Sequence, residues 1–382
     1  MKPDSLRAST ARGLAWMAAG SGVQAFAQLL VVAVLARLVT PEEFGVVGLA
    51  LLVVAFGTLL PQVGVGQALV QCADLDETHV RTGLTMALTI GLVGAGLALA
   101  LARPIAGFFR VEAWAGLLGV MGLLLPVAAA GTVSEALLQR AMRFRALALV
   151  NVAAYGLGFG IVGVVLALRG LGPWALVGGH FAQALLRTVL AYALVRHPAR
   201  PLFDPVAARA LTRFGLGISI AGVNNQVARK ADAFVVGRWL GADALGLYER
   251  AYQFVVMPLA LLGQVMDRVL FAAMAQRQER PDVLARAFRQ GVHAVALASL
   301  PVAALMAVVS PELVAVLLGP DWSQAAGPFA VLAAGILFRT GAKVSDAVTR
   351  ATGAVYRRAW RQGVYAATVF LGAMLGARGG LV

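Results

Sequence analysis

The chain has 382 residues, of which 60% are hydrophobic and only 13% are charged, and its mean hydropathy is +0.81. These values exclude an ordinary soluble domain, because such domains carry about 45–50% apolar and about 25% charged residues. The net charge of +14 would suit nucleic acid, but the arginines lie in short loops and form no continuous basic face, so we expect no nucleic-acid partner. The single cysteine, Cys72, excludes an intrachain disulfide.

Apolar runs of about 20 residues, long enough to cross the hydrocarbon core of a bilayer, follow one another along the chain. They predict an all-α polytopic membrane protein with about eleven transmembrane helices. In chain order, we place the helices at residues 13–36, 44–70, 82–102, 113–138, 146–168, 173–195, 214–237, 244–273, 290–310, 324–349 and 362–382. Two segments too short to span, 103–109 and 311–323, are expected to form elbows between helices.

Lys and Arg residues are distributed unequally between the two sides of the predicted membrane. One side receives the N-terminus and Arg81, and then the groups within 140–145, 196–213, 277–289 and 350–361. The opposite loops receive Arg37, Arg103, Arg110, Arg169 and Arg238. Because Lys and Arg accumulate in cytoplasmic loops, we expect a multi-pass protein of the cytoplasmic (inner) membrane with its N-terminus in the cytoplasm.

An internal repeat relates the two halves of the chain. The segment ARLVTPEEFGVVGLA at 36–50 resembles GRWLGADALGLYERA at 237–251. At one constant spacing, the matched pairs are Arg37 and Arg238, Gly45 and Gly246, and Ala50 and Ala251, and Gln28 aligns with Arg229. Further on, Ser134-Glu135-Ala136 matches Ser345-Asp346-Ala347. Each half begins on the cytoplasmic side, so we expect two parallel six-helix repeats, a transporter architecture with its site between the halves.

The repeat predicts two lobes of unequal length. Residues 1–200 would form an N-terminal lobe of six transmembrane helices, and residues 201–382 a C-terminal lobe of five. The counterpart of the sixth helix is missing from the second half, so we expect a C-terminally truncated or naturally short form. The polar, proline-containing stretch 196–213 would link the lobes, with an interfacial amphipathic helix within it.

Motifs of soluble enzymes are missing from the sequence, so we expect neither an enzyme nor a cofactor. No G-x-x-x-x-G-K-[ST] loop occurs, and the four histidines have no metal-ligand spacing. The run Gly156-Leu157-Gly158-Phe159-Gly160 superficially resembles a dinucleotide-binding loop. It lies inside an apolar helix, where closely spaced glycines favour tight helix packing.

Ionisable and polar residues inside predicted membrane helices are the candidates for function, since such residues are costly there and usually face a wet cavity. Three helices carry polar stripes at helical spacing: 173–195 with His180, Gln183 and Arg187; 214–237 with Asn225, Arg229 and Asp232; and 324–349 with Arg339, Lys343 and Asp346. The predicted substrate-binding set is Gln24, Gln28, Arg187, Asn225, Arg229, Lys230, Asp232, Arg250, Arg339, Lys343 and Asp346.

The cations outnumber the acids in this set, which suits an anionic substrate group such as a phosphate. The alternative is that these side chains form structural salt bridges, such as Arg229 with Asp232 or Lys343 with Asp346. Both interpretations stay open at this point.

The stretch 231–271 resembles polysaccharide flippases of the Wzx type, which belong to the multidrug/oligosaccharidyl-lipid/polysaccharide exporter superfamily. The resemblance is strongest at the G-x-Y-x-x-A core of Gly246, Tyr248 and Ala251, and it extends to 35–50 and 64–71. It implies transport of lipid-linked oligosaccharide repeat units, typically on undecaprenyl pyrophosphate, by alternating access through a cationic cavity. Membrane lipids and glycan polymerase machinery would be partners, in exopolysaccharide or lipopolysaccharide biosynthesis. Family members usually have twelve or fourteen helices, and the eleven predicted for this chain differ from that number.

Two other functions are kept open. A cation-coupled multidrug exporter of the same superfamily would need a cavity dominated by acidic and aromatic residues, which the surplus of Arg and Lys disfavours. A membrane-embedded enzyme or a non-catalytic scaffold of glycan synthesis would need a functional motif in a long loop, and the predicted loops are short.

Overall fold

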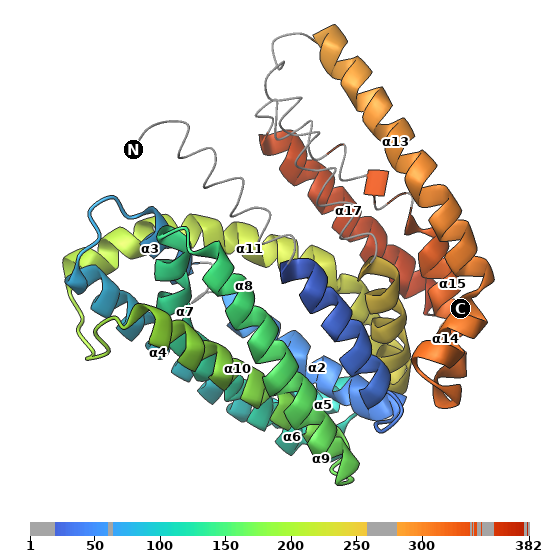
Figure 1. Ribbon diagram of the computed structural model, residues 1–382, viewed down its shortest axis with the longest axis horizontal. Coiled ribbons are helices and arrows are strands. Elements are labelled where there is room, and N and C mark those ends of the chain that lie inside the picture. The colour runs from blue at the N-terminus through green and yellow to red at the C-terminus, as the bar shows by residue number, and fades with distance from the viewer. Residues whose placement is uncertain are drawn as a thin grey trace. The chain divides into compact units, whose positions relative to one another are not determined.

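The computed structural model describes residues 20–59, 64–257, 281–336, 338, 340–341, 345, 355–377 and 380. Within these ranges every regular element is helical (Figure 1). The chain divides into two compact units, Met1–Val227 and Ala228–Val382, which are called unit 1 and unit 2.

Unit 1 consists of long apolar helices joined by short turns. Its first described helix is Gly20–Leu35. In chain order there follow α2 (Pro41–Gly57), α3 (Gln67–Gln71), α4 (Glu77–Ala100), α5 (Ala102–Phe109), η2 (Glu112–Trp114), α6 (Ala115–Gly122), α7 (Leu124–Arg140), α8 (Phe144–Ala153), the π-helical η3 (Ala154–Val162), α9 (Gly163–Leu168) and α10 (Pro173–Val195). The long helix α11 (Pro205–Trp239) begins in unit 1 and ends in unit 2.

Unit 2 contains the end of α11 and a helix over 241–257. The elements that follow are α13 (Pro281–Val308), α14 (Ser310–Leu317), η4 (Pro320–Ala325), α15 (Ala326–Ala334) and α17 (Val355–Gly376). The C-terminal part of the predicted helix 244–273 lies outside the described residues, as does most of 337–354.

Among the described residues, four helical stretches are long and apolar enough to cross a membrane: Glu77–Ala100, Glu112–Arg140, Phe144–Leu168 and Phe288–Val308. Shorter apolar helices occupy Gly20–Leu35 and Gly363–Gly376. The prediction of an all-α polytopic membrane protein is confirmed. The total of eleven spans, and the division into lobes of six and five helices, stay predictions.

Both predicted elbows are short helices. Residues 103–109 lie within α5, which is followed by the 3-10 turn η2, and residues 311–323 cover α14 and most of η4. In both units a long helix is therefore followed by a helix of eight residues, a 3-10 segment and another apolar helix. This shared order of elements agrees with the internal repeat seen in the sequence.

The segment between the predicted lobes is shorter than expected. Helix α11 begins at Pro205 and runs without interruption to Trp239, so residues 205–213 continue into the next predicted helix instead of forming a separate interfacial one. The extended residues before Pro205 are hydrogen-bonded to α4, where Arg81 donates to the Arg200 carbonyl at 3.0 Å and the Thr85 hydroxyl donates to the Leu202 carbonyl at 2.9 Å. These bonds satisfy backbone groups that would otherwise lack partners.

Local sequence signals start two of the helices of unit 1. Thr40 and Glu43 form a reciprocal capping box at the beginning of α2, and Pro41 occupies its first turn. The Asp76 carboxylate accepts a hydrogen bond from the His79 backbone N–H at 2.8 Å and caps α4. The hydrogen bonds from the backbone and side chain of His79 lower the pKa of the Asp76 carboxyl.

Close packing at glycines positions α10 in unit 1. Helix α10 packs against η3 and α7. A Cβ atom placed on Gly158 of η3 would lie 2.6 Å from the Cα atom of Gln183 in α10, a distance that real Cβ contacts do not show. The glycine run is therefore a helix-packing motif, as predicted, and Gly158 allows the backbone of α10 its close approach.

We predict that Gly158→Ala destabilises the protein by about 1–3 kcal/mol, because the added methyl group must displace the α10 backbone. The matched control is Gly156→Ala in the same helix, since a Cβ atom there meets nothing within 4 Å. Alanine at that position should be neutral or stabilising by up to about 1 kcal/mol. Thermal unfolding of the detergent-purified variants measures the difference, and equal midpoints for the two would contradict this account of the packing.

Candidate functional site

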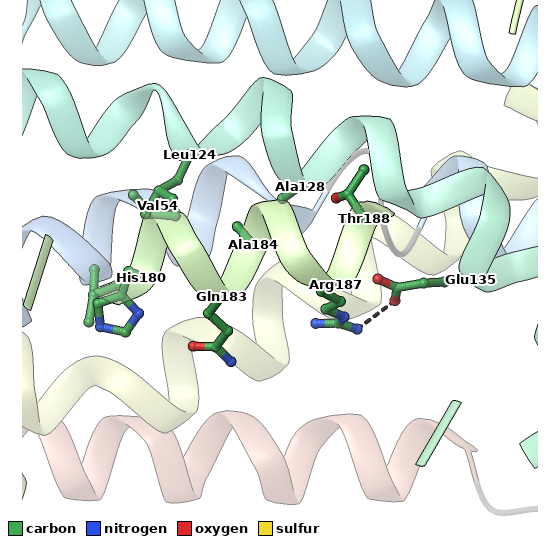
Figure 2. A pocket seen from close by; sticks show the side chains of 10 residues that line it. Val54, Leu124, Ala128, Glu135, His180, Gln183, Ala184, Arg187 and Thr188 are labelled. Carbon is green, nitrogen blue, oxygen red and sulfur yellow. Dashed lines mark hydrogen bonds and ion pairs between the residues drawn. The ribbon is translucent and has the colours of Figure 1, made fainter. Parts of the chain in front are cut away.

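A pocket of unit 1 lies between α2, α7 and α10 (Figure 2). Its volume is about 600 Å³, which includes space open to the outside. The lining residues are Leu51 and Val54 from α2, Leu124, Ala128 and Glu135 from α7, and His180, Gln183, Ala184, Arg187 and Thr188 from α10. The polar stripe predicted on helix 173–195 therefore faces a pocket, because His180, Gln183 and Arg187 follow one another along one face of α10.

The charged residues of this pocket form an ion pair. The Arg187 guanidinium donates to the Glu135 carboxylate at 2.5 Å, and the two side chains are 38% and 25% exposed, respectively. Residues on α7 and α10 thus cancel each other's charge within an apolar bundle. Glu135 was absent from the predicted site set. The repeat contained the signal that would have found it, because it aligns Glu135 with the candidate Asp346.

Two polar groups of the pocket keep unused hydrogen-bonding capacity. The Gln183 amide makes no hydrogen bond to another described residue, and the Arg187 Nε atom is buried without a partner among them. Thr188 differs, since its hydroxyl already donates to the Val127 carbonyl at 3.1 Å. The His180 ring is packed against Phe159, with the ring centroids 4.6 Å apart.

A second cluster of charged residues lies in unit 2, between the end of α11 and the helix 241–257. Lys230 Nζ contacts Glu249 Oε1 at 2.8 Å, and the Tyr248 hydroxyl donates to Asp232 Oδ2, also at 2.8 Å. Arg250 donates to the Gln253 side chain at 2.6 Å and lies 3.9 Å from Glu249. This cluster contains three of the predicted site residues, Lys230, Asp232 and Arg250.

The Tyr248–Asp232 hydrogen bond gives a physical reason for the G-x-Y-x-x-A motif. Gly246 and Ala251 are buried at the same helix, so their small side chains allow close packing, and Tyr248 between them reaches the buried Asp232. Glu249 and Tyr248 are partners that the predicted set did not contain. Expected pairs such as Arg229 with Asp232 rested on spacing within one helix, whereas both of these contacts join two helices.

The remaining predicted site residues are placed as follows. Arg229 and Asn225 are exposed on α11, and Gln24 and Gln28 are partly exposed on the helix Gly20–Leu35. Arg339, Lys343 and Asp346 lie outside the described residues, and with them the alternative pair Lys343–Asp346. A role in substrate binding stays a prediction for every member of the set.

The family model of the polysaccharide biosynthesis proteins matches residues 34–327. The chain belongs to this family. A relative from Rhizobium meliloti (strain 1021), the succinoglycan biosynthesis transport protein ExoT, is 30% identical over 78% of this chain and 60% of its own length. The lipopolysaccharide biosynthesis protein WzxC of Escherichia coli (strain K12) is 25% identical over 84% of this chain and 65% of WzxC. The chain thus spans about three fifths of ExoT.

Solved structures show the same fold. The lipid II flippase MurJ in an inward closed conformation aligns with a TM-score of 0.71 at 12% identity, over 94% of this chain and 78% of MurJ. An inward-facing multidrug resistance transporter of the MATE family, from the MOP superfamily, aligns with a TM-score of 0.63 at 14% identity, over 94% and 93% of the two chains. At these identities the likeness shows the fold alone. The predicted resemblance to the polysaccharide flippases is confirmed, and family membership agrees with the expectation that the chain is not an enzyme.

We predict that Glu135 and Arg187 are energetically coupled. Glu135→Gln and Arg187→Gln should each destabilise the protein by about 1–3 kcal/mol, because each leaves one charge unpaired among apolar helices. The double variant should cost less than the sum of the two, with a coupling of about 1–2 kcal/mol in denaturant unfolding. The control is the more exposed pair of Glu77 and Arg81, 3.3 Å apart, whose coupling should stay below about 0.5 kcal/mol. Similar coupling in both pairs would contradict the prediction.

We also predict that Tyr248→Phe destabilises the protein by about 1–3 kcal/mol, since the buried Asp232 carboxylate loses a hydrogen-bond donor. Asp232→Leu should remove most of this effect, because phenylalanine then replaces a tyrosine that no longer has Asp232 as an acceptor. Unfolding of the single and double variants completes the cycle. An unchanged cost of Tyr248→Phe in the Asp232→Leu background would show that the hydrogen bond does not carry the effect.

Proposed function

We propose that the protein flips lipid-linked oligosaccharide repeat units, of the undecaprenyl pyrophosphate type, across the cytoplasmic membrane by alternating access through a cationic cavity. The observation that carries this proposal is the family match over 34–327, and the relative ExoT, which is named as a transport protein, agrees with it. The fold shared with MurJ, a lipid II flippase, supports the same class of cargo. The N-terminus would lie in the cytoplasm, as the distribution of Lys and Arg predicts.

The chemistry of such a cargo explains why cations would lie inside the membrane. A diphosphate cannot cross the hydrocarbon core alone, because burying an unpaired charge is very costly. Fixed guanidinium and ammonium groups offset that cost by charge-assisted hydrogen bonds. Beside the cluster of unit 2, the exposed Arg229 adds a third cation to Lys230 and Arg250, so the three cations exceed the two acids, Asp232 and Glu249, by one positive charge. Arg339 and Lys343 would add to this surplus.

Two partners follow from this proposal. Membrane lipids would surround the polyprenyl tail of the cargo, which never needs to leave the apolar phase. Glycan polymerase machinery would receive the flipped repeat units on the other side. The division of the chain into two compact units supports a mechanism in which two bodies move.

We predict that Lys230→Gln lowers glycan export about tenfold or more, since a charge-assisted hydrogen bond contributes about 1.5–3 kcal/mol. The test complements a strain that lacks the gene and measures surface glycan together with protein abundance. Lys230→Arg, which keeps the charge, should retain most of the export. Arg289→Gln, at an exposed position of α13, is the matched control for the loss of one positive charge and should export normally.

A further variant separates transport from stability. Lys230→Gln leaves Glu249 without its 2.8 Å partner, which alone could reduce abundance. The double variant Lys230→Gln/Glu249→Gln removes both charges and should restore abundance but not export. Restored export in that double variant would show that Lys230 has a structural role only. Normal export by Lys230→Gln and by Lys343→Ala would overturn the cationic mechanism.

A further inference from the structure

The pocket of unit 1 differs in charge from the cluster of unit 2. Among its described lining residues, the only carboxylate, Glu135, and the only guanidinium, Arg187, are already paired at 2.5 Å. A diphosphate placed there would meet the Glu135 carboxylate beside Arg187 and would have to break the pair. A cationic ligand would meet the same obstacle from Arg187. The charges of this pocket therefore disfavour both anions and cations as ligands.

The unused polar groups of the pocket suit a neutral ligand that both donates and accepts hydrogen bonds. The Gln183 amide offers two N–H donors and a carbonyl acceptor, and Arg187 Nε offers one further donor. The Glu135 carboxylate has acceptor capacity beyond its bond to Arg187. A hydroxyl group can accept a hydrogen bond from Gln183 or Arg187 and at the same time donate one to Gln183 or Glu135. Figure 2 shows the Gln183 and Arg187 side chains projecting from the same side of α10, one turn apart.

The other walls of the pocket are apolar. Val54, Leu124, Ala128 and Ala184 face the same space, and the His180 ring is held against Phe159. Small-ligand sites have this composition, in which apolar walls surround a few polar groups. A sugar ring has this mixed character, since its hydroxyls lie at the rim and its C–H groups on its faces.

We infer that the pocket between α2, α7 and α10 binds uncharged, hydroxyl-bearing sugar residues of the cargo, while its phosphate groups are held elsewhere. This inference rests on the proposed function and adds that different residues bind the glycan and the diphosphate of the cargo. Gln183 and the Glu135–Arg187 pair contact glycan hydroxyls, and the cations of unit 2 contact the diphosphate. Arg187 then acts as part of a neutral hydrogen-bonding pair and not as an anion ligand.

The experiment measures the binding of two probes to the intact chain, purified in detergent, by calorimetry. One probe is the repeat-unit oligosaccharide released by mild acid from the host's lipid-linked pool, and the other is inorganic pyrophosphate. Gln183→Leu keeps the size of the side chain and removes its polar atoms. It should weaken oligosaccharide binding about tenfold and leave pyrophosphate binding unchanged within about twofold. Lys230→Gln should show the reverse pattern.

The outcomes distinguish this inference from the proposed function. If Gln183→Leu leaves oligosaccharide binding unchanged, or weakens both probes equally, the inference is overturned. Binding of pyrophosphate alone by the wild-type protein would also overturn it, while the proposed function would stand. If the wild-type protein binds neither probe and a strain without the gene exports normal glycan, both proposals fail together. The inference is supported if Gln183→Leu weakens only oligosaccharide binding and Lys230→Gln weakens only pyrophosphate binding.

Discussion

The constraint on which the structure depends is that a charge placed among apolar helices needs a partner. The hydrocarbon core of a membrane offers no water, so an ionised side chain must be compensated by the protein itself. The two contacts that meet this demand most directly are Glu135 with Arg187 in unit 1 and Lys230 with Glu249 in unit 2. Each joins two different helices. Each therefore fixes the register of two helices as well as two charges, and links packing to the candidate sites.

Compensation of this kind works only when the helices approach closely. In unit 1 the approach is made possible by glycine. Gly158 brings η3 against the backbone of α10 at Gln183, and a Cβ atom on Gly179 of α10 would lie 3.0 Å from the Phe159 ring. The same contacts hold His180 against that ring. The face of α10 that carries Gln183 and Arg187 is thus positioned by these contacts with η3, where small residues remove the bulk that would keep two apolar helices apart.

The sequence predicted most of what depends on local pattern. Apolar runs located the helices, the short segments 103–109 and 311–323 were recognised as elbows, and the glycine run at 156–160 was interpreted as packing. The stripe of His180, Gln183 and Arg187 was placed on one face from its spacing alone.

The partners of the charges were not predicted. Spacing within one helix suggested pairs such as Arg229 with Asp232, which stays a prediction, and it could not suggest Glu135 and Glu249, which come from other helices than Arg187 and Lys230. Pattern gives the direction of a side chain, but only the packing of helices shows what it meets. The uninterrupted course of α11 was missed for a related reason, because prolines and charges at 196–213 favoured a longer linker.

The internal repeat shows which polar residues of the second half have apolar counterparts in the first. At the constant spacing that aligns Arg37 with Arg238, the polar residues Lys230, Asp232, Tyr248 and Glu249 of the second half correspond to Leu29, Val31, Val47 and Gly48 of the first. Both halves keep a helix that ends near this arginine, a short turn and a second helix. The first hairpin has three aliphatic residues and a glycine at those four positions, and the second carries an ion pair and a tyrosine–carboxylate hydrogen bond. In unit 1 an ion pair joins α7 and α10 instead, and its two charges cancel. The two halves that the sequence repeat aligns thus carry two different polar clusters, one with Arg229 as an additional cation beside it and one whose two charges cancel. A cargo with a charged diphosphate and an uncharged glycan has the same two kinds of surface, which is why the asymmetry of the repeat supports a division of binding between the halves.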